Sequence, residues 1–72
     1  MKKIKWSWKE VIGKRRVYAR MGRGEIIVRV ENDGDTSRYA EYGYPKIMGV
    51  ISAARLAAVE VPEKDILPEE SR

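Results

Sequence analysis

Residues 45–60 read PKIMGVISAARLAAVE, which is the one long apolar run in the chain. Apolar side chains recur in it at steps of three and four residues, so they share one face of a helix. Pro45 suits the first helical position, because its missing N–H would have no partner there. The run therefore predicts one buried helix over residues 45–60, laid across a small sheet. Its apolar face holds Ile47, Val50, Ile51, Ala54, Ala57 and Ala58.

A second interpretation divides the same run. Residues 46–51 would then form another strand, and Ser52 would cap a shorter helix that begins at Ala53. In either case small residues recur four apart, which lets another backbone come close. That backbone is a strand of the same chain or a helix of a second copy. The residues predicted for helix packing or a homodimer contact are Ile47, Gly49, Val50, Ala53 and Ala57.

Four segments before the helix have the alternation of strands. They cover residues 3–9, 16–21, 25–31 and 36–42, and the turns between the last three contain Gly22-Arg23-Gly24 and Asp33-Gly34. The pattern predicts an α+β fold, in which a small antiparallel meander of three to four strands packs on one C-terminal helix. Residues 1–60 would form this single domain, and residues 61–72 an acidic tail with two prolines.

Alternation also assigns the side chains to faces of the sheet. The residues predicted to face the helix are Val17, Ala19, Met21, Ile26, Val28 and Val30. Trp6 and Trp8 are two apart and share a face with Ile4, so we expect both in the core, which has no Phe to supply bulk. The alternative for this pair is a stacking platform flanked by Lys5 and Lys9.

Charge is distributed unevenly along the chain. Residues 1–30 hold ten Lys or Arg against two Glu, a net +8, whereas residues 31–72 carry a net −4. Arginines that point outward from a sheet can bind phosphate or base edges, and a tyrosine between them offers a stacking surface. This pattern predicts a nucleic-acid-binding face, with DNA favoured over RNA. Its residues are Lys14, Arg15, Arg16, Tyr18, Arg20, Arg23, Arg29 and Arg38. The alternative is an ordinary solvated face, with Glu25, Glu31 and Glu41 as cross-strand partners.

Enzymatic chemistry is not expected. The chain has no His and no Cys, so the commonest general base, metal ligands and activated nucleophiles are missing. Gly22-Arg23-Gly24 is followed by a strand rather than a helix, which is wrong for a phosphate-binding loop. A calcium loop centred on Gly34 would put Arg29 at its first ligand position. We therefore predict no catalytic residues, no metal and no cofactor.

Size and composition set further limits. A chain of 72 residues without disulfides has a small core, so unusually good packing or a dimer is expected. One Asn, no Gln and many charges are typical of a thermophile's protein. No signal peptide is visible, and the apolar run is too short to span a bilayer. These features favour a cytoplasmic protein without a membrane partner.

Residues 17–59 resemble, in the order of three meander strands and one helix, the arm-type DNA-binding domains of phage integrases and the plant AP2-type domain. The resemblance consists of that order, of Tyr18-Ala19-Arg20 and of the strand pattern at residues 25–31. Both families read DNA through the sheet, so the resemblance implies a sheet that faces DNA. The alternative function is a protein–protein adaptor or inhibitor that acts through its apolar helix or a strand edge.

Overall fold

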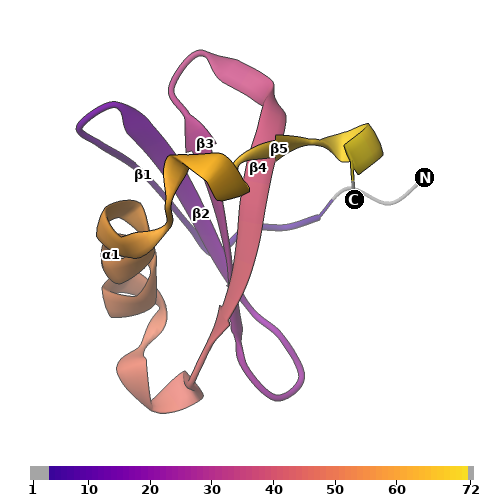
Figure 1. Cartoon of the computed structure of the whole chain (residues 1–72). Coiled ribbons are helices and arrows are strands. Elements are labelled where there is room, and N and C mark those ends of the chain that lie inside the picture. The colour runs from indigo at the N-terminus through magenta and orange to yellow at the C-terminus, as the bar shows by residue number, and fades with distance from the viewer. Residues whose placement is uncertain (1–3, 72) are drawn as a thin grey trace.

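A computed structural model describes residues 4–71 and shows one antiparallel sheet with a helix on one face (Figure 1). The elements are β1 (Trp8–Ile12), β2 (Arg15–Met21), β3 (Ile26–Asn32), β4 (Asp35–Tyr44), α1 (Val50–Glu60) and β5 (Leu67–Pro68), with 3₁₀ turns at Lys46–Met48, Glu63–Asp65 and Glu69–Ser71. The strand order β1-β2-β3-β4-β5 confirms the predicted α+β meander. Five strands rather than three to four are present, because the chain returns after α1 and β5 pairs with β4.

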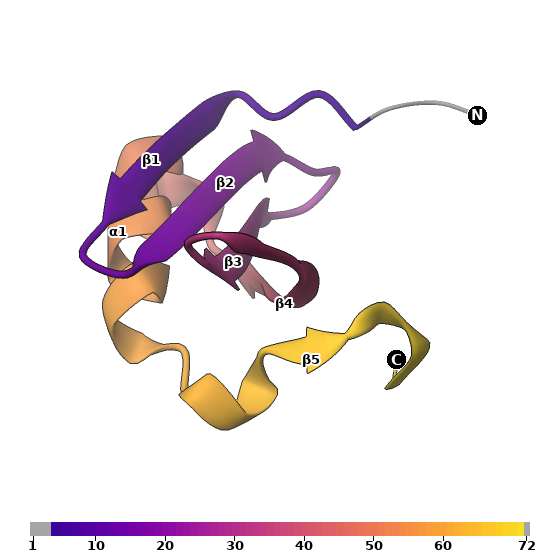
Figure 2. The ribbon, with the colours of Figure 1, turned by 90° about the horizontal axis from the view of Figure 1, so that it is seen from above.

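The core lies between α1 and one face of the sheet. Val17 and Ala19 of β2 and Ile26, Val28 and Val30 of β3 are all fully buried, as the alternation predicted. The helix contributes Ala53, Ala54 and Ala57, whose small side chains let α1 approach β2 and β3 closely. Viewed from above, α1 lies beneath β1 and β2, while β5 lies beyond β4 (Figure 2). Met21 is half exposed at the end of β2, so its predicted core position was wrong.

The helix starts later than predicted. Lys46–Met48 forms a 3₁₀ turn, and Gly49 has a φ of 83° with an extended ψ, so α1 begins only at Val50. Residues 46–51 are not a strand either. The chain changes direction at Gly49. Glycine suits this position, because few residues with a side chain tolerate a positive φ. As a result the buried helical face is built from alanines, while Ile47 is 95% exposed and Ile51 is 41% exposed.

The first strand is also displaced. Lys3 lies outside the described residues, and β1 covers Trp8–Ile12, so it shares only Trp8 and Lys9 with the predicted 3–9 segment. One further bond, from Ser7 N to Ala19 O at 2.8 Å, precedes the strand. Trp8 packs against the core, whereas Trp6 contacts Tyr18, which points away from it. The prediction that the two tryptophans share a face was therefore wrong, since strand alternation does not extend back to Trp6.

The C-terminal segment is tied to β4 by three tyrosines. Tyr44 donates to Glu60 at 2.7 Å, Tyr42 donates to Asp65, and Tyr39 donates to Glu69. These hydrogen bonds follow β4 from its end back toward its start. Val61 and Ile66, which are 1% and 3% exposed, add apolar anchors. The acidic segment thus packs beside β4, and β5 pairs with its backbone at Arg38 and Tyr39.

Candidate nucleic-acid interface

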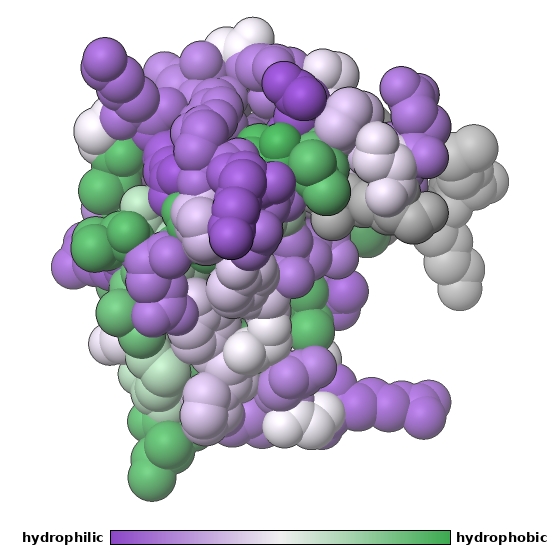
Figure 3. Space-filling view, in the orientation of Figure 1, coloured by the Kyte–Doolittle hydropathy of each residue, from purple (hydrophilic) through white to green (hydrophobic). Residues whose placement is uncertain are grey.

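The outer face is the face of the sheet opposite α1. Its central residues alternate with the core residues of β2 and β3, and they are Arg16, Tyr18, Arg20, Ile27, Arg29 and Glu31. Tyr18 lies opposite Arg29 in the antiparallel register, and Arg20 lies opposite Ile27. Three of the predicted arginines therefore converge on one side of the molecule. Figure 3 shows hydrophilic groups on the side that faces away from α1, below the grey atoms.

Trp6 lies over this face and binds two of its arginines. The guanidinium carbons of Arg20 and Arg29 are 5.6 and 5.3 Å from the centre of the Trp6 ring. The Tyr18 ring is 5.6 Å from the same indole, and Arg29 also lies 4.0 Å from the Tyr39 ring. Cation–π contacts of this kind stabilise by about 0.5–1 kcal/mol each at exposed sites. The Trp6 cluster is defined here as Trp6, Tyr18, Arg20, Arg29 and Tyr39.

Carboxylates of the same chain neutralise part of the outer face. Arg16 pairs with Asp33 at 3.0 Å, and Arg29 donates from Nε and Nη2 to one Glu41 oxygen at 2.9 and 2.7 Å. The Tyr18 hydroxyl and Asp33 raise the pKa of Arg16, so this guanidinium stays charged. The side chains of both ion pairs keep contact with solvent. Such pairs contribute only about 0–1 kcal/mol, so a phosphate can replace the carboxylate at small cost.

The uncompensated positive charge lies on β1 and β2. Within residues 4–71 Arg20 forms no ion pair, and its buried Nε has no hydrogen-bond partner. Arg16 Nε is buried without a partner as well. Lys9 lies opposite Tyr18 in the β1–β2 ladder, and no described carboxylate is within ion-pair distance of it. The acidic residues of the outer face belong instead to β3, the β3–β4 turn, β4 and the segment after α1.

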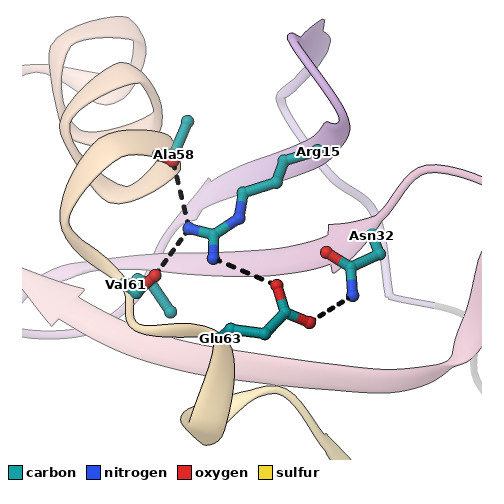
Figure 4. Close-up of polar contacts among 5 residues, drawn as sticks. All are labelled: Arg15, Asn32, Ala58, Val61 and Glu63. Carbon is teal, nitrogen blue, oxygen red and sulfur yellow. Dashed lines mark hydrogen bonds and ion pairs between the residues drawn. The ribbon is translucent and has the colours of Figure 1, made fainter.

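Arg15 does not lie on the outer face, which corrects its predicted place beside Arg16. Its Nη1 donates to the carbonyl oxygens of Ala58 at 3.1 Å and Val61 at 2.5 Å (Figure 4). Its Nη2 lies 3.5 Å from Glu63, which also accepts a 2.6 Å bond from Asn32. Arg15 therefore satisfies carbonyl groups at the C-terminal end of α1, where a positive charge is favourable.

The other three predicted residues lie at the rim. Lys14, exposed in the turn before β2, lines a hollow of about 540 Å³ on the side of Arg15 and Glu63. Arg23 is at the tip of the β2–β3 hairpin, where its carbonyl oxygen accepts a bond from Lys46. Arg38 is exposed on β4, where it lines a second hollow with Arg29, Tyr39 and acidic residues of the last turn. The structure thus gathers Arg16, Tyr18, Arg20 and Arg29 and leaves Lys14, Arg23 and Arg38 at the edges.

Sequence reasoning missed two members of the Trp6 cluster as site residues. Tyr39 lies two residues from Glu41, the partner of Arg29 in the β3–β4 ladder, so alternation places it on the face where Arg29 packs on its ring. Trp6 was assigned to the core because alternation through residues 3–9 is unbroken in the sequence. Strand parity could therefore have indicated Tyr39, whereas no residue pattern marks the break in alternation before β1.

A second exposed surface lies on the helical side. The helix surface is defined as Ile47, Ile51, Leu56 and Val59, which are 95%, 41%, 40% and 80% exposed. By contrast Ala53 and Ala57 are fully buried against the sheet of their own chain, and Val50 is half-buried there. Gly49 is exposed at the start of α1. The row of small residues therefore receives strands of the same chain.

Fold and site together define a small α+β meander domain with one basic, aromatic sheet face. Compared with known proteins, the chain matches no family model, no curated protein and no solved structure. Within residues 4–71 no helix is long and apolar enough to cross a membrane. In the same residues no group of three or more acidic side chains is placed to hold a metal ion.

Proposed function

We propose that this protein binds nucleic acid through the outer face of its sheet, with DNA as the first candidate. The observation that supports the proposal is the convergence of Arg16, Arg20 and Arg29 on one face, around Tyr18 and beneath Trp6. Arginine forks match phosphate oxygens, and aromatic rings beside them match bases. The proposed role is binding rather than catalysis, in the cytoplasm, where nucleic acid is available.

The free cations would make the first contact. Arg20 and Lys9 have no carboxylate partner among the described residues, so a phosphate that reaches them displaces only water and counterions. Arg16 and Arg29 would exchange Asp33 and Glu41 for phosphate afterwards. Because each exchange costs one ion pair, affinity would come mainly from the β1–β2 side of the face.

The test is a titration of labelled DNA, followed by fluorescence anisotropy at about 50 and about 200 mM salt. Replacing Arg16, Arg20 and Arg29 by Ala should weaken binding and reduce the slope of log K against log salt by about 2–3, close to one per lost phosphate contact. An unchanged slope in this triple variant would remove the outer face from consideration.

A charge-matched control separates position from net charge. Lys46, Arg55 and Lys64 lie outside the outer face, on or beside the helix and in the segment after it. Their replacement by Ala removes the same total charge and should leave the salt slope within about 0.5 of that of the unmodified protein. Equal losses in the two triple variants would mean that only overall charge matters.

A second candidate function is contact with another protein through the helix surface, which we assign to a second copy of this chain. The four exposed aliphatic side chains of the helix surface favour this function. Ile47 and Val59, which are 95% and 80% exposed, would gain most from burial against a partner. Sedimentation equilibrium of a dimer would give a molecular mass of twice the 8.3 kDa of the chain. The double variant Ile47→Lys and Val59→Lys should then be monomeric, whereas an unmodified protein that is already monomeric would contradict the dimer.

A further inference from the structure

We infer that the outer face receives single-stranded rather than duplex nucleic acid, and that an unpaired base stacks on the indole of Trp6. This inference rests on the proposed function and specifies its ligand. It depends on three features of the described residues. These are the position of Trp6, the contacts that already occupy the other aromatic rings, and the location of positive charge that has no carboxylate partner.

Trp6 is held over the sheet without being buried in it. Both guanidinium groups that contact its ring, at 5.6 and 5.3 Å, come from the sheet below, as does the Tyr18 ring. The side chain is only half-buried, so the exposed part of the indole faces outward. A ring fixed in this way loses little conformational freedom when a base stacks on it, and base stacking does not require a particular sequence.

The remaining aromatic side chains are already engaged. Tyr18 donates to Glu31 and lies under Trp6, and Tyr39 donates to Glu69 with Arg29 packed on its ring. The other three rings belong to the core side: Trp8, Tyr42 and Tyr44 all pack in or against the apolar cluster. Trp6 also contacts Arg20, Arg29 and Tyr18, but it is half-buried and forms no side-chain hydrogen bond within residues 4–71, so we take it as the ring of the outer face that can receive a base.

The shape of the face also favours a single strand. A hollow of about 510 Å³ opens beside Arg29 and Tyr39, and the C-terminal turn stands at one side of it in Figure 1. A rigid duplex presents its bases only to an element that projects into a groove. A single strand, whose bases are unstacked and free to turn, can enter the hollow. Its phosphates would then pass the unpaired Arg20 guanidinium and Lys9, which lie on the two strands nearest Trp6.

The experiment uses Trp6 as its own reporter. In the variant Trp8→Phe, Trp6 is the single tryptophan, and an oligothymidine of about twelve nucleotides should quench its emission by about half or more as the base stacks. A hairpin duplex of the same charge should quench it little. Trp6→Ala should weaken oligothymidine binding by roughly 5–100-fold, with duplex binding changed by less than about 2-fold, whereas Trp6→Phe should retain most of the affinity.

The outcomes separate the two proposals. If neither oligonucleotide binds at low salt, the proposed function fails and the inference fails with it. If both bind equally well while Trp6 emission is unchanged, or if Trp6→Ala binds the single strand normally, the stacking inference is overturned and the proposed function remains. Should Trp8→Phe not fold, binding of labelled oligothymidine to Trp6→Ala is measured by fluorescence anisotropy, and the fold of this variant is checked by circular dichroism. Unweakened binding by Trp6→Ala would overturn the stacking inference.

Discussion

Arg15 allows a quantitative test of whether a basic residue stabilises the C-terminal end of α1. Its guanidinium donates to the carbonyl oxygens of Ala58 and Val61, and its side chain is only 17% exposed. Replacement by Ala would leave both acceptors without this charged donor. Hydrogen bonds to charged groups contribute about 1.5–3 kcal/mol each, but the two bonds share one nitrogen and do not add fully. The favourable charge at the helix C-terminus contributes about 0.3–1 kcal/mol more.

The expected loss in the free energy of unfolding for Arg15→Ala is therefore about 2–4 kcal/mol. The ion pair with Glu63 adds little, since that carboxylate is 69% exposed. In a domain of this size the loss corresponds to a fall in Tm on the order of 10–25 °C. Thermal and urea denaturation followed by circular dichroism would measure both quantities.

Two variants provide the comparison. Arg16→Ala removes the neighbouring arginine, whose pair with Asp33 is formed by side chains that are 42% and 45% exposed, and it should cost at most about 1 kcal/mol. Arg15→Lys keeps the charge but not the planar fork, so it should recover only part of the loss. If Arg15→Ala costs no more than Arg16→Ala, the role of Arg15 as the helix C-terminal partner is refuted.

Three further predictions concern the core and two titratable contacts. Ala57→Leu should lower the free energy of unfolding by about 1–3 kcal/mol, because Ala57 is fully buried and the larger side chain separates α1 from the sheet; an unchanged Tm would show that the interface has spare room. Asp65 raises the pKa of Tyr42 above its ordinary value of 10.0 by accepting a hydrogen bond from its hydroxyl group, so this contact stabilises the fold below pH 10 and its contribution is lost as the pH rises through the raised pKa. Asp65→Asn should lower the pKa of Tyr42, measured by NMR, and flatten the loss of stability above pH 10. Arg55 lowers the pKa of Glu10 below 4.5, so its contribution is present above that pH and is lost as the pH falls through the lowered pKa; Arg55→Gln should return the pKa of Glu10 toward 4.5.

Controls for these predictions come from the same elements. Val59→Leu enlarges an 80% exposed helical residue and should change the free energy of unfolding by less than about 0.5 kcal/mol. For the titrations, Tyr42→Phe removes the ionising group. The free energy of unfolding of this variant should therefore fall less steeply above pH 10 than that of the unmodified protein. A pKa of Glu10 that stays low in Arg55→Gln would show that another group holds the carboxylate charged.

The basic face was predictable in part. Alternation in β2 and β3 placed Arg16, Arg20 and Arg29 on one side, because side chains of a strand point to opposite faces in turn. The same rule, applied consistently, would have placed Arg15 with Val17 toward the helix. Arg15 was instead grouped with its basic neighbours, which shows that strand parity is a better guide than local charge.

The sequence by itself determined the order of the first four strands, the two tight turns, the core residues of β2 and β3 except at Met21, and the presence of one C-terminal helix. These are local properties: alternation, turn glycines and apolar periodicity act over a few residues. The tertiary structure decided where α1 begins, which way Trp6 faces, that Arg15 serves the helix, and that the acidic segment pairs with β4. The start of α1 follows from the local backbone conformation at Gly49, whereas the other three depend on contacts between groups far apart in the chain, about which a pattern within one segment carries no information.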